Sequence, residues 1–160
     1  MRNCLIFSES DFCIGLIGDM INGNYEKFRL EIRELLKNAI SFRNLKEENS
    51  YYLFVIGLVS IISENYFVKS NVESGDGIPD LVLKPKDKNK KAFIFEFKYS
   101  RAKDSKNLKR TAKSALKQIN DRNYAEGLKY EGYENITKIG MGFRKKDVEV
   151  AIETEFIIEE

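Results

Sequence analysis

The chain has 160 residues, of which 42% are hydrophobic and 32% are charged, and this composition predicts one soluble globular domain over residues 1–160. The absence of histidine excludes Ser-His-Asp and Cys-His catalysis and histidine-based zinc sites. No apolar run reaches the ~18 residues of a membrane span, and no signal-peptide pattern opens the chain, so we expect a cytoplasmic protein with no membrane partner.

The net charge of +2 conceals an uneven distribution. Residues 84–117 hold 13 basic and 3 acidic residues, a net charge of +10, whereas the rest of the chain holds 14 and 22, a net charge of −8. A basic segment beside an acidic remainder favours a polyanionic partner, and a solvated lysine-rich surface explains it equally well.

The first half of the chain is predicted to be helical. Residues 1–44 are expected to form an N-terminal helical segment packed on the core, because apolar side chains recur at helical spacing over residues 24–40. A second helix is expected from about residue 44 to residue 63, with a buried stripe that includes Tyr52 and Val55.

The second half changes to the two-residue period of strands. Three strands are expected first, over residues 66–73, 78–84 and 92–98. A long helix over residues 105–129 leads to a final pair of strands, over residues 136–143 and 148–156. Strands in a run followed by a crossover helix indicate an α/β fold with a mixed central sheet flanked by helices.

Alternation along the strands brings polar residues to one face of this sheet. In the strand over residues 92–98, three phenylalanines point one way, while Glu96 and Lys98 point the other. If residues 85–91 close a hairpin, the register places Asp80 directly opposite Glu96, with Lys98 two residues further on.

Two opposed carboxylates are unfavourable by up to ~1 kcal/mol. A divalent cation with oxygen ligands relieves this repulsion, because Mg²⁺ favours one or two carboxylates together with water and phosphate oxygens. Lys98 is then placed to orient the attacking water or to stabilise charge on a phosphate. The alternative is a simple ion pair between Lys98 and the two acids on a solvated face, and the spacing by itself slightly favours it.

The residues also carry a family resemblance. Gly77-Ile-Pro-Asp80, followed by Phe95-Glu-Phe-Lys98, resembles the signature of the PD-(D/E)XK nuclease superfamily. Further segments resemble the nuclease-like domain found at the C-terminus of AAA-ATPase-like proteins: Glu48–Leu58, Lys69–Gly77, Ala115–Ile119 and Tyr124-Ala125. The resemblance covers about residues 20–150.

The resemblance implies a restriction-endonuclease-like αβββαβ core and Mg²⁺-dependent hydrolysis of phosphodiester bonds, with Mn²⁺ as a substitute. It implies that Asp80, Glu96 and the backbone carbonyl of Phe97 hold the metal and that Lys98 assists the water. Superfamily members often use a glutamate of the first core helix as a further ligand, and Glu48 takes that place. An acid that only stabilises the helix N-terminus is the alternative for Glu48.

The long helix contributes further candidates. Gln118 lies on the flank that borders the site, where it would contact substrate or a metal-bound water, and an ordinary amide at the helix boundary is the alternative. Four basic residues face outward as candidate nucleic-acid contacts: Lys109, Arg110, Lys113 and Lys117. If the lysine-rich loop over residues 85–91 lies on the same side, the two form one funnel for a phosphate backbone.

The leading hypothesis is therefore a Mg²⁺-dependent nuclease with nucleic acid as its partner, DNA rather than RNA. A homodimer and an ATPase or other protein partner are compatible with the sequence. The rival hypothesis is a catalytically idle nuclease-like module that binds nucleic acid or a protein.

Overall fold

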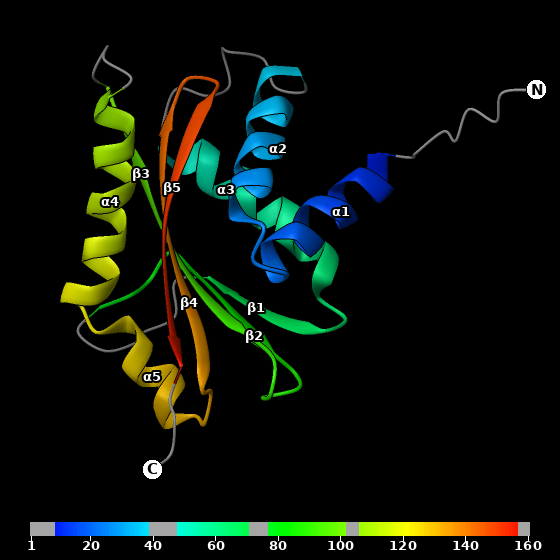
Figure 1. Cartoon of the computed structure of the whole chain (residues 1–160), viewed down its shortest axis with the longest axis vertical. Helices are drawn as coiled ribbons and strands as arrows, with labels where there is room; N and C mark the ends of the chain where they lie inside the picture. Colours follow the sequence, from blue (N-terminus) through cyan, green and yellow to red (C-terminus); the bar gives the residue numbers. More distant parts are fainter. Residues whose placement is uncertain (1–8, 39–47, 71–76, 102–105, 157–160) are drawn as a thin grey trace, which may run out of the picture.

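The chain forms an α/β structure in which one mixed sheet is covered by helices on both faces (Figure 1). The computed structural model describes residues 9–38, 48–70, 77–101 and 106–156. The helices are α1 (Glu9–Ile21), α2 (Tyr25–Asn38), α3 (Glu48–Val59), the short 3-10 helix η2 (Ser60–Ile62), α4 (Lys106–Asp121) and α5 (Tyr124–Tyr130). The strands are β1 (Tyr66–Ser70), β2 (Leu81–Pro85), β3 (Ala92–Tyr99), β4 (Asn135–Arg144) and β5 (Asp147–Phe156).

The five strands lie in the order β1-β2-β3-β4-β5, so that β3 is central. Only β3 and β4 are parallel, and the other neighbouring pairs are antiparallel. A parallel pair needs a long crossover, and α4 and α5 supply it on one face of the sheet, while α1, α2 and α3 lie on the other (Figure 1). In the part of the chain described, no helix is both long and apolar enough to pass through a membrane.

The hairpin of β2 and β3 has the register that the sequence predicts. Leu81 pairs with Phe95 and Leu83 pairs with Phe93. Continuing this register by one residue brings Asp80 opposite Glu96. The strand itself starts at Leu81 rather than at residue 78, because the preceding Pro79 has no backbone N–H to give to a ladder.

The alternation along β3 divides the core in two, as predicted. Phe93, Phe95 and Phe97 are buried in the larger cluster, together with apolar side chains of α1, α2 and α3. On the other face, Ile94 joins a smaller cluster formed by α4, α5 and their neighbours. Glu96 and Lys98 share the face of Ile94, so the polar end of β3 lies under α4.

The predicted helix over residues 105–129 is broken in the structure. Helix α4 ends at Asp121 and α5 begins at Tyr124. Between them, Asn123 adopts a left-handed backbone conformation with φ 53°, which asparagine tolerates better than most residues. The break redirects the chain, so that Tyr124 and Leu128 pack back against the sheet as buried residues.

Helix α4 lies unusually close to β4 because two glycines of the strand face it. A Cβ atom on Gly140 would overlap the backbone of Leu116 and Ala112. A Cβ atom on Gly142 would lie 2.8 Å from the backbone nitrogen of Ala112, which is closer than real contacts allow. Any side chain at these two positions must therefore push the helix off the sheet.

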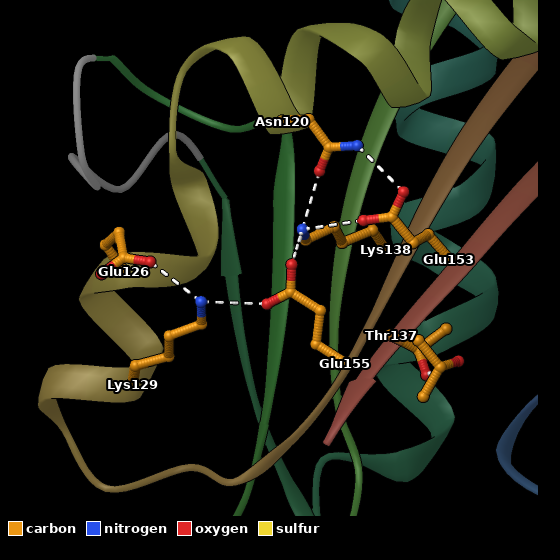
Figure 2. A network of polar contacts seen from close by, with 8 residues as sticks. Asn120, Glu126, Lys129, Thr137, Lys138, Glu153 and Glu155 are labelled. Carbon is orange, nitrogen blue, oxygen red and sulfur yellow. Dashed lines mark hydrogen bonds and ion pairs between the residues drawn. The ribbon is translucent and has the colours of Figure 1, made fainter. Parts of the chain in front are cut away.

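A buried ionic network fastens the end of this helical layer to β4 and β5 (Figure 2). Lys138 of β4 is only 4% exposed, and its ammonium group donates to Asn120 Oδ1 at 2.7 Å. The same group also bonds Glu153 at 3.1 Å and Glu155. Lys129 of α5 extends the network by bridging Glu155 at 3.0 Å. Both carboxylates belong to β5, so α4, α5, β4 and β5 are joined at one point.

We expect Gly140→Ala to destabilise the fold by about 1–3 kcal/mol, because the added methyl group overlaps the α4 backbone. Gly57→Ala is the matched control: Gly57 is an exposed residue of α3 with no atom within 4 Å of the added Cβ. Alanine is the better helix former, so this control should be neutral or stabilising by up to ~1 kcal/mol. Chemical denaturation measures the free energy of unfolding of both variants and of wild type. If Gly140→Ala were as stable as wild type, the result would contradict the close approach of α4.

A second prediction concerns pH. Burial opposes ionisation of Glu155, but hydrogen bonds from Lys138 and Lys129 outweigh it and hold the pKa of Glu155 below its ordinary value of 4.5. Such a group stabilises the fold above the ordinary pKa, and the stabilisation is lost as the pH falls through the lowered folded-state pKa. Glu155→Gln should therefore lower the melting temperature at pH 7, by an amount that shrinks steadily in more acidic buffers.

Glu126→Gln is the control for this prediction. Its carboxylate pairs with the same Lys129, but the side chain is 63% exposed. Exposed pairs contribute ~0–1 kcal/mol, so we expect little change at any pH. If Glu155→Gln shows the same small, pH-independent effect, the network contributes no net stability.

Candidate active site

Asp80 is held in place by a backbone group of the neighbouring strand. It stands directly before β2, where the ladder between β2 and β3 ends at the pair Leu81–Phe95. Its Oδ2 accepts the backbone N–H of Phe97 at 2.8 Å. A carboxylate here takes the place of the backbone acceptor that a longer β2 would provide, and this contact fixes Asp80 beside the polar face of β3.

Glu96 is the buried acid of this site. Its side chain is on the α4 face of β3 and the residue is 5% exposed. The amide Nε2 of Gln118, from the C-terminal half of α4, donates to Glu96 Oε1. A charged group at this depth needs hydrogen-bond partners, and the close packing of α4 on the sheet supplies one from the amide of Gln118.

Lys98 completes the polar face of β3. Its ammonium group contacts Ser114 Oγ of α4 at 3.3 Å. Between β3 and α4 lies a cleft of about 520 Å³ whose lining includes Asp80, Glu96, Phe97, Lys98, Tyr99 and Gln118. The structure therefore brings together five of the residues singled out from the sequence: Asp80, Glu96, Phe97, Lys98 and Gln118.

Burial dominates the electrostatics of Asp80 in the cleft. Burial raises the pKa of Asp80, and the Phe97 N–H and the positive charge of Lys98 offset this only in part. The ionised form of Asp80 is therefore less favourable than in water. Two carboxylates that face one cleft in this state favour the binding of a cation.

Tyr124 belongs to the segments that carry the family resemblance, but the sequence does not predict its role in the site. This α5 residue is 3% exposed, and burial is the main reason that its pKa is raised. A hydrogen bond with Gln118 acts in the opposite direction, and the charges of Glu96 and Asp80 raise the pKa further. Tyr124 therefore contacts the same Gln118 side chain that donates to Glu96.

The break at Asn123 explains why the role of Tyr124 is not visible in the sequence. In a continuous helix, Tyr124 would follow Gln118 by six residues and would point about 120° away from it around the helix axis. Because the helix breaks, Tyr124 returns to the same place, with its hydroxyl 3.2 Å from the point where a Cβ on Gly77 would lie. The contact with Gly77 connects Tyr124 to the segment that carries Asp80.

The remaining candidates lie elsewhere or outside the described part. Glu48 begins α3, but its side chain is not among those described, so its role as a ligand stays a prediction. Lys109, Arg110, Lys113 and Lys117 are all exposed on α4. Lys109 contributes to lowering the pKa of Glu26 in α2. Lys109 stands nine residues before Gln118, which places it on the side of α4 away from the cleft.

The lysine-rich loop before β3 does not join the helix face. It lies at the opposite end of β3 from Lys98. Lys84, which precedes it, pairs with Glu131 at 2.6 Å, and Lys88 donates to the backbone carbonyl of the same residue. The expected funnel formed by both segments is therefore wrong, because the hairpin register directs the loop to the corner between α5 and β4.

The chain belongs to the PD-(D/E)XK nuclease superfamily, whose family model matches residues 46–153. This range begins just before α3 and ends within β5, so it contains every residue of the cleft. A search of curated proteins found no match to the chain. Nucleases of this superfamily generally depend on a divalent metal ion and act on nucleic acid. The closer resemblance to the domain attached to AAA-ATPase-like proteins stays a prediction.

The raised pKa of Asp80 leads to a test in metal-free protein. At a pH below its ordinary pKa of 3.8, Asp80 is protonated in both the folded and the unfolded chain, so folding buries no charge at this position. As the pH rises through the raised folded-state pKa, ionisation destabilises the fold. Asp80→Asn removes the charge and keeps an oxygen for the Phe97 N–H. In EDTA at pH 8 this variant should therefore melt at a higher temperature than wild type, whereas at acidic pH the two proteins should melt at the same temperature.

Asp80→Ala separates the charge from the hydrogen bond. It also removes the charge, but it leaves the Phe97 N–H without its acceptor, at a cost of about 1–3 kcal/mol. We therefore expect the alanine variant to melt below the asparagine variant at every pH. An asparagine variant that is less stable than wild type in EDTA at pH 8 would show that the cleft does not strain the ionised carboxylate.

Proposed function

We propose that this protein is a Mg²⁺-dependent nuclease that hydrolyses phosphodiester bonds of nucleic acid, with DNA as the preferred substrate. The observation that carries the proposal is the cleft in which Asp80 and Glu96 face each other beside Lys98. Membership of the nuclease superfamily supports the same reaction class. A homodimer and an ATPase or other protein partner remain compatible with this function.

The donor set of the cleft fits a hard divalent cation. Among the described residues, no group of three or more His, Cys, Asp and Glu side chains could hold a metal ion. Mg²⁺ is held by one or two carboxylates and keeps several waters, so Asp80 and Glu96, with the Phe97 carbonyl, suffice to hold it. When bound, the ion supplies Lewis acidity and neutralises charge on the phosphate.

Three further residues in and beside the cleft have distinct parts in this proposal. Lys98 orients the attacking water and stabilises the negative charge that develops on the phosphate oxygens. Gln118 holds Glu96 in one orientation, which keeps the carboxylate ready for the metal. Tyr124 supports Gln118 and so acts through it as a positioning residue.

The test is hydrolysis of labelled DNA and RNA with Mg²⁺ or Mn²⁺, and with EDTA as the metal-free reference. Lys98→Met keeps most of the side-chain volume but removes the ammonium group, and we expect the rate to fall by roughly 100- to 1,000-fold, as when a preorganised electrostatic donor is lost. Lys37→Met is the control, because Lys37 is a lysine of α2 that pairs with Glu34, away from the cleft.

Two outcomes would contradict the proposal. The first is an equal rate for wild type and Lys98→Met, which would assign the hydrolysis to a contaminant or to another site. The second is that wild type hydrolyses neither nucleic acid with any divalent ion although it binds Mn²⁺ or nucleic acid. The chain would then be an idle module with the nuclease fold.

A further inference from the structure

A second hollow adjoins the cleft on the α4 side. It has a volume of about 300 Å³, and its lining includes Lys98, Ser114, Lys117, Gln118, Asp121 and Arg122. Lys98 and Gln118 line both cavities, so the hollow continues directly from the place where Asp80 and Glu96 meet. Any extended substrate that enters the cleft from this side must cross it.

The chemistry of the hollow suits a phosphate group. It offers two ammonium groups, a guanidinium group, a hydroxyl and an amide, nearly all of them hydrogen-bond donors. Its charged side chains carry three positive charges and one negative charge, on Asp121. Arginine and lysine beside a hydroxyl donor form the usual set of contacts to a phosphate oxygen.

Helix geometry separates this hollow from Lys109 of α4. Ser114, Gln118 and Asp121 follow one another at intervals of four and three residues and so lie on one face of the helix. Lys109 stands nine residues before Gln118, about two and a half turns, which places it on the opposite side. The influence of Lys109 on Glu26 in α2 agrees with this placement.

We infer that this hollow binds the backbone phosphate next to the one that is cleaved, and that the nucleic acid therefore runs along the C-terminal half of α4. The inference rests on the proposed nuclease function and adds to it the path of the substrate. Lys117 and Arg122 are the principal contacts, with Ser114 as a neutral donor. Lys109 lies outside this path.

Substitution of Asp121 should tighten the binding of nucleic acid, which damage to the structure would not do. Asp121 forms an ion pair with Lys117, and the side chains are 56% and 71% exposed, respectively. In the free protein the carboxylate competes with a phosphate for the same ammonium group. Asp121→Asn removes this competition and one negative charge, so it should tighten binding of nucleic acid, whereas Arg122→Gln should weaken it.

The experiment measures binding of a short fluorescein-labelled DNA duplex, and of each of its single strands, by fluorescence anisotropy in EDTA over a series of salt concentrations. For the duplex, Arg122→Gln should reduce the slope of log K against log salt by about 0.9 and weaken all sequences alike by roughly threefold to tenfold. Asp121→Asn should tighten binding severalfold. Lys37→Gln, on α2, is the control and should leave binding unchanged.

The variant Lys109→Gln distinguishes the two paths on α4. A small effect of this substitution, beside the opposite effects at Arg122 and Asp121, supports the inferred path. If Lys109→Gln reduces the salt slope by about 0.9 and the Arg122 and Asp121 variants bind like wild type, the nucleic acid follows the other side of α4 and the inference is wrong.

Failure of the inference is distinguishable from failure of the proposed function, because binding is measured without metal and cleavage separately with Mg²⁺. Wild type that binds and cleaves DNA, with unaltered binding in the Arg122 and Asp121 variants, overturns only the phosphate subsite. Wild type that neither binds nor cleaves any nucleic acid overturns both.

Discussion

The contact between α4 and β4 determines the geometry of the cleft. Gly140 and Gly142 have no side chains, so the backbone of α4 lies directly on the strand. At this short separation Gln118 reaches Glu96 and Ser114 reaches Lys98, and each contact joins the helix to a charged residue of β3. A helix held further away by side chains at these positions would leave a buried carboxylate without its amide donor. The residues that carry the proposed chemistry thus depend on two positions of β4 that take no part in it.

Two further features hold the helical layer in place. Lys138 and its partners attach Asn120 to β4 and β5, two residues beyond Gln118 on the same helix. The left-handed residue Asn123 then turns the chain, and Tyr124 packs against Gln118 and Gly77. The end of α4 is therefore fixed on both sides, which limits the freedom of the amide that contacts Glu96. Lys138 is buried and its ammonium group has three partners, so this contact gives the corner of the sheet a defined geometry.

The central strand connects the core with the cleft. One face of β3 places three phenylalanines in the larger hydrophobic cluster, and the other face presents Glu96 and Lys98 to α4. Asp80 joins them because its carboxylate accepts the Phe97 N–H where β2 ends. The basic segment is divided by the same topology. Lys84 and Lys88 contact Glu131 at one end of the sheet, whereas Lys98 of β3 lines the cleft and Lys117 of α4 lines the adjoining hollow.

The sequence by itself determined the α/β class, the hairpin register and the convergence of Asp80, Glu96 and Lys98 on one face, because alternation along paired strands is a local property. It also placed Gln118 on the correct flank of its helix, since helical periodicity is local as well. Only the tertiary structure decided the break at Asn123, the part played by Tyr124 and the distance of α4 from the sheet. These features depend on contacts between residues far apart in the chain, and neither a two-residue nor a 3.6-residue period records them.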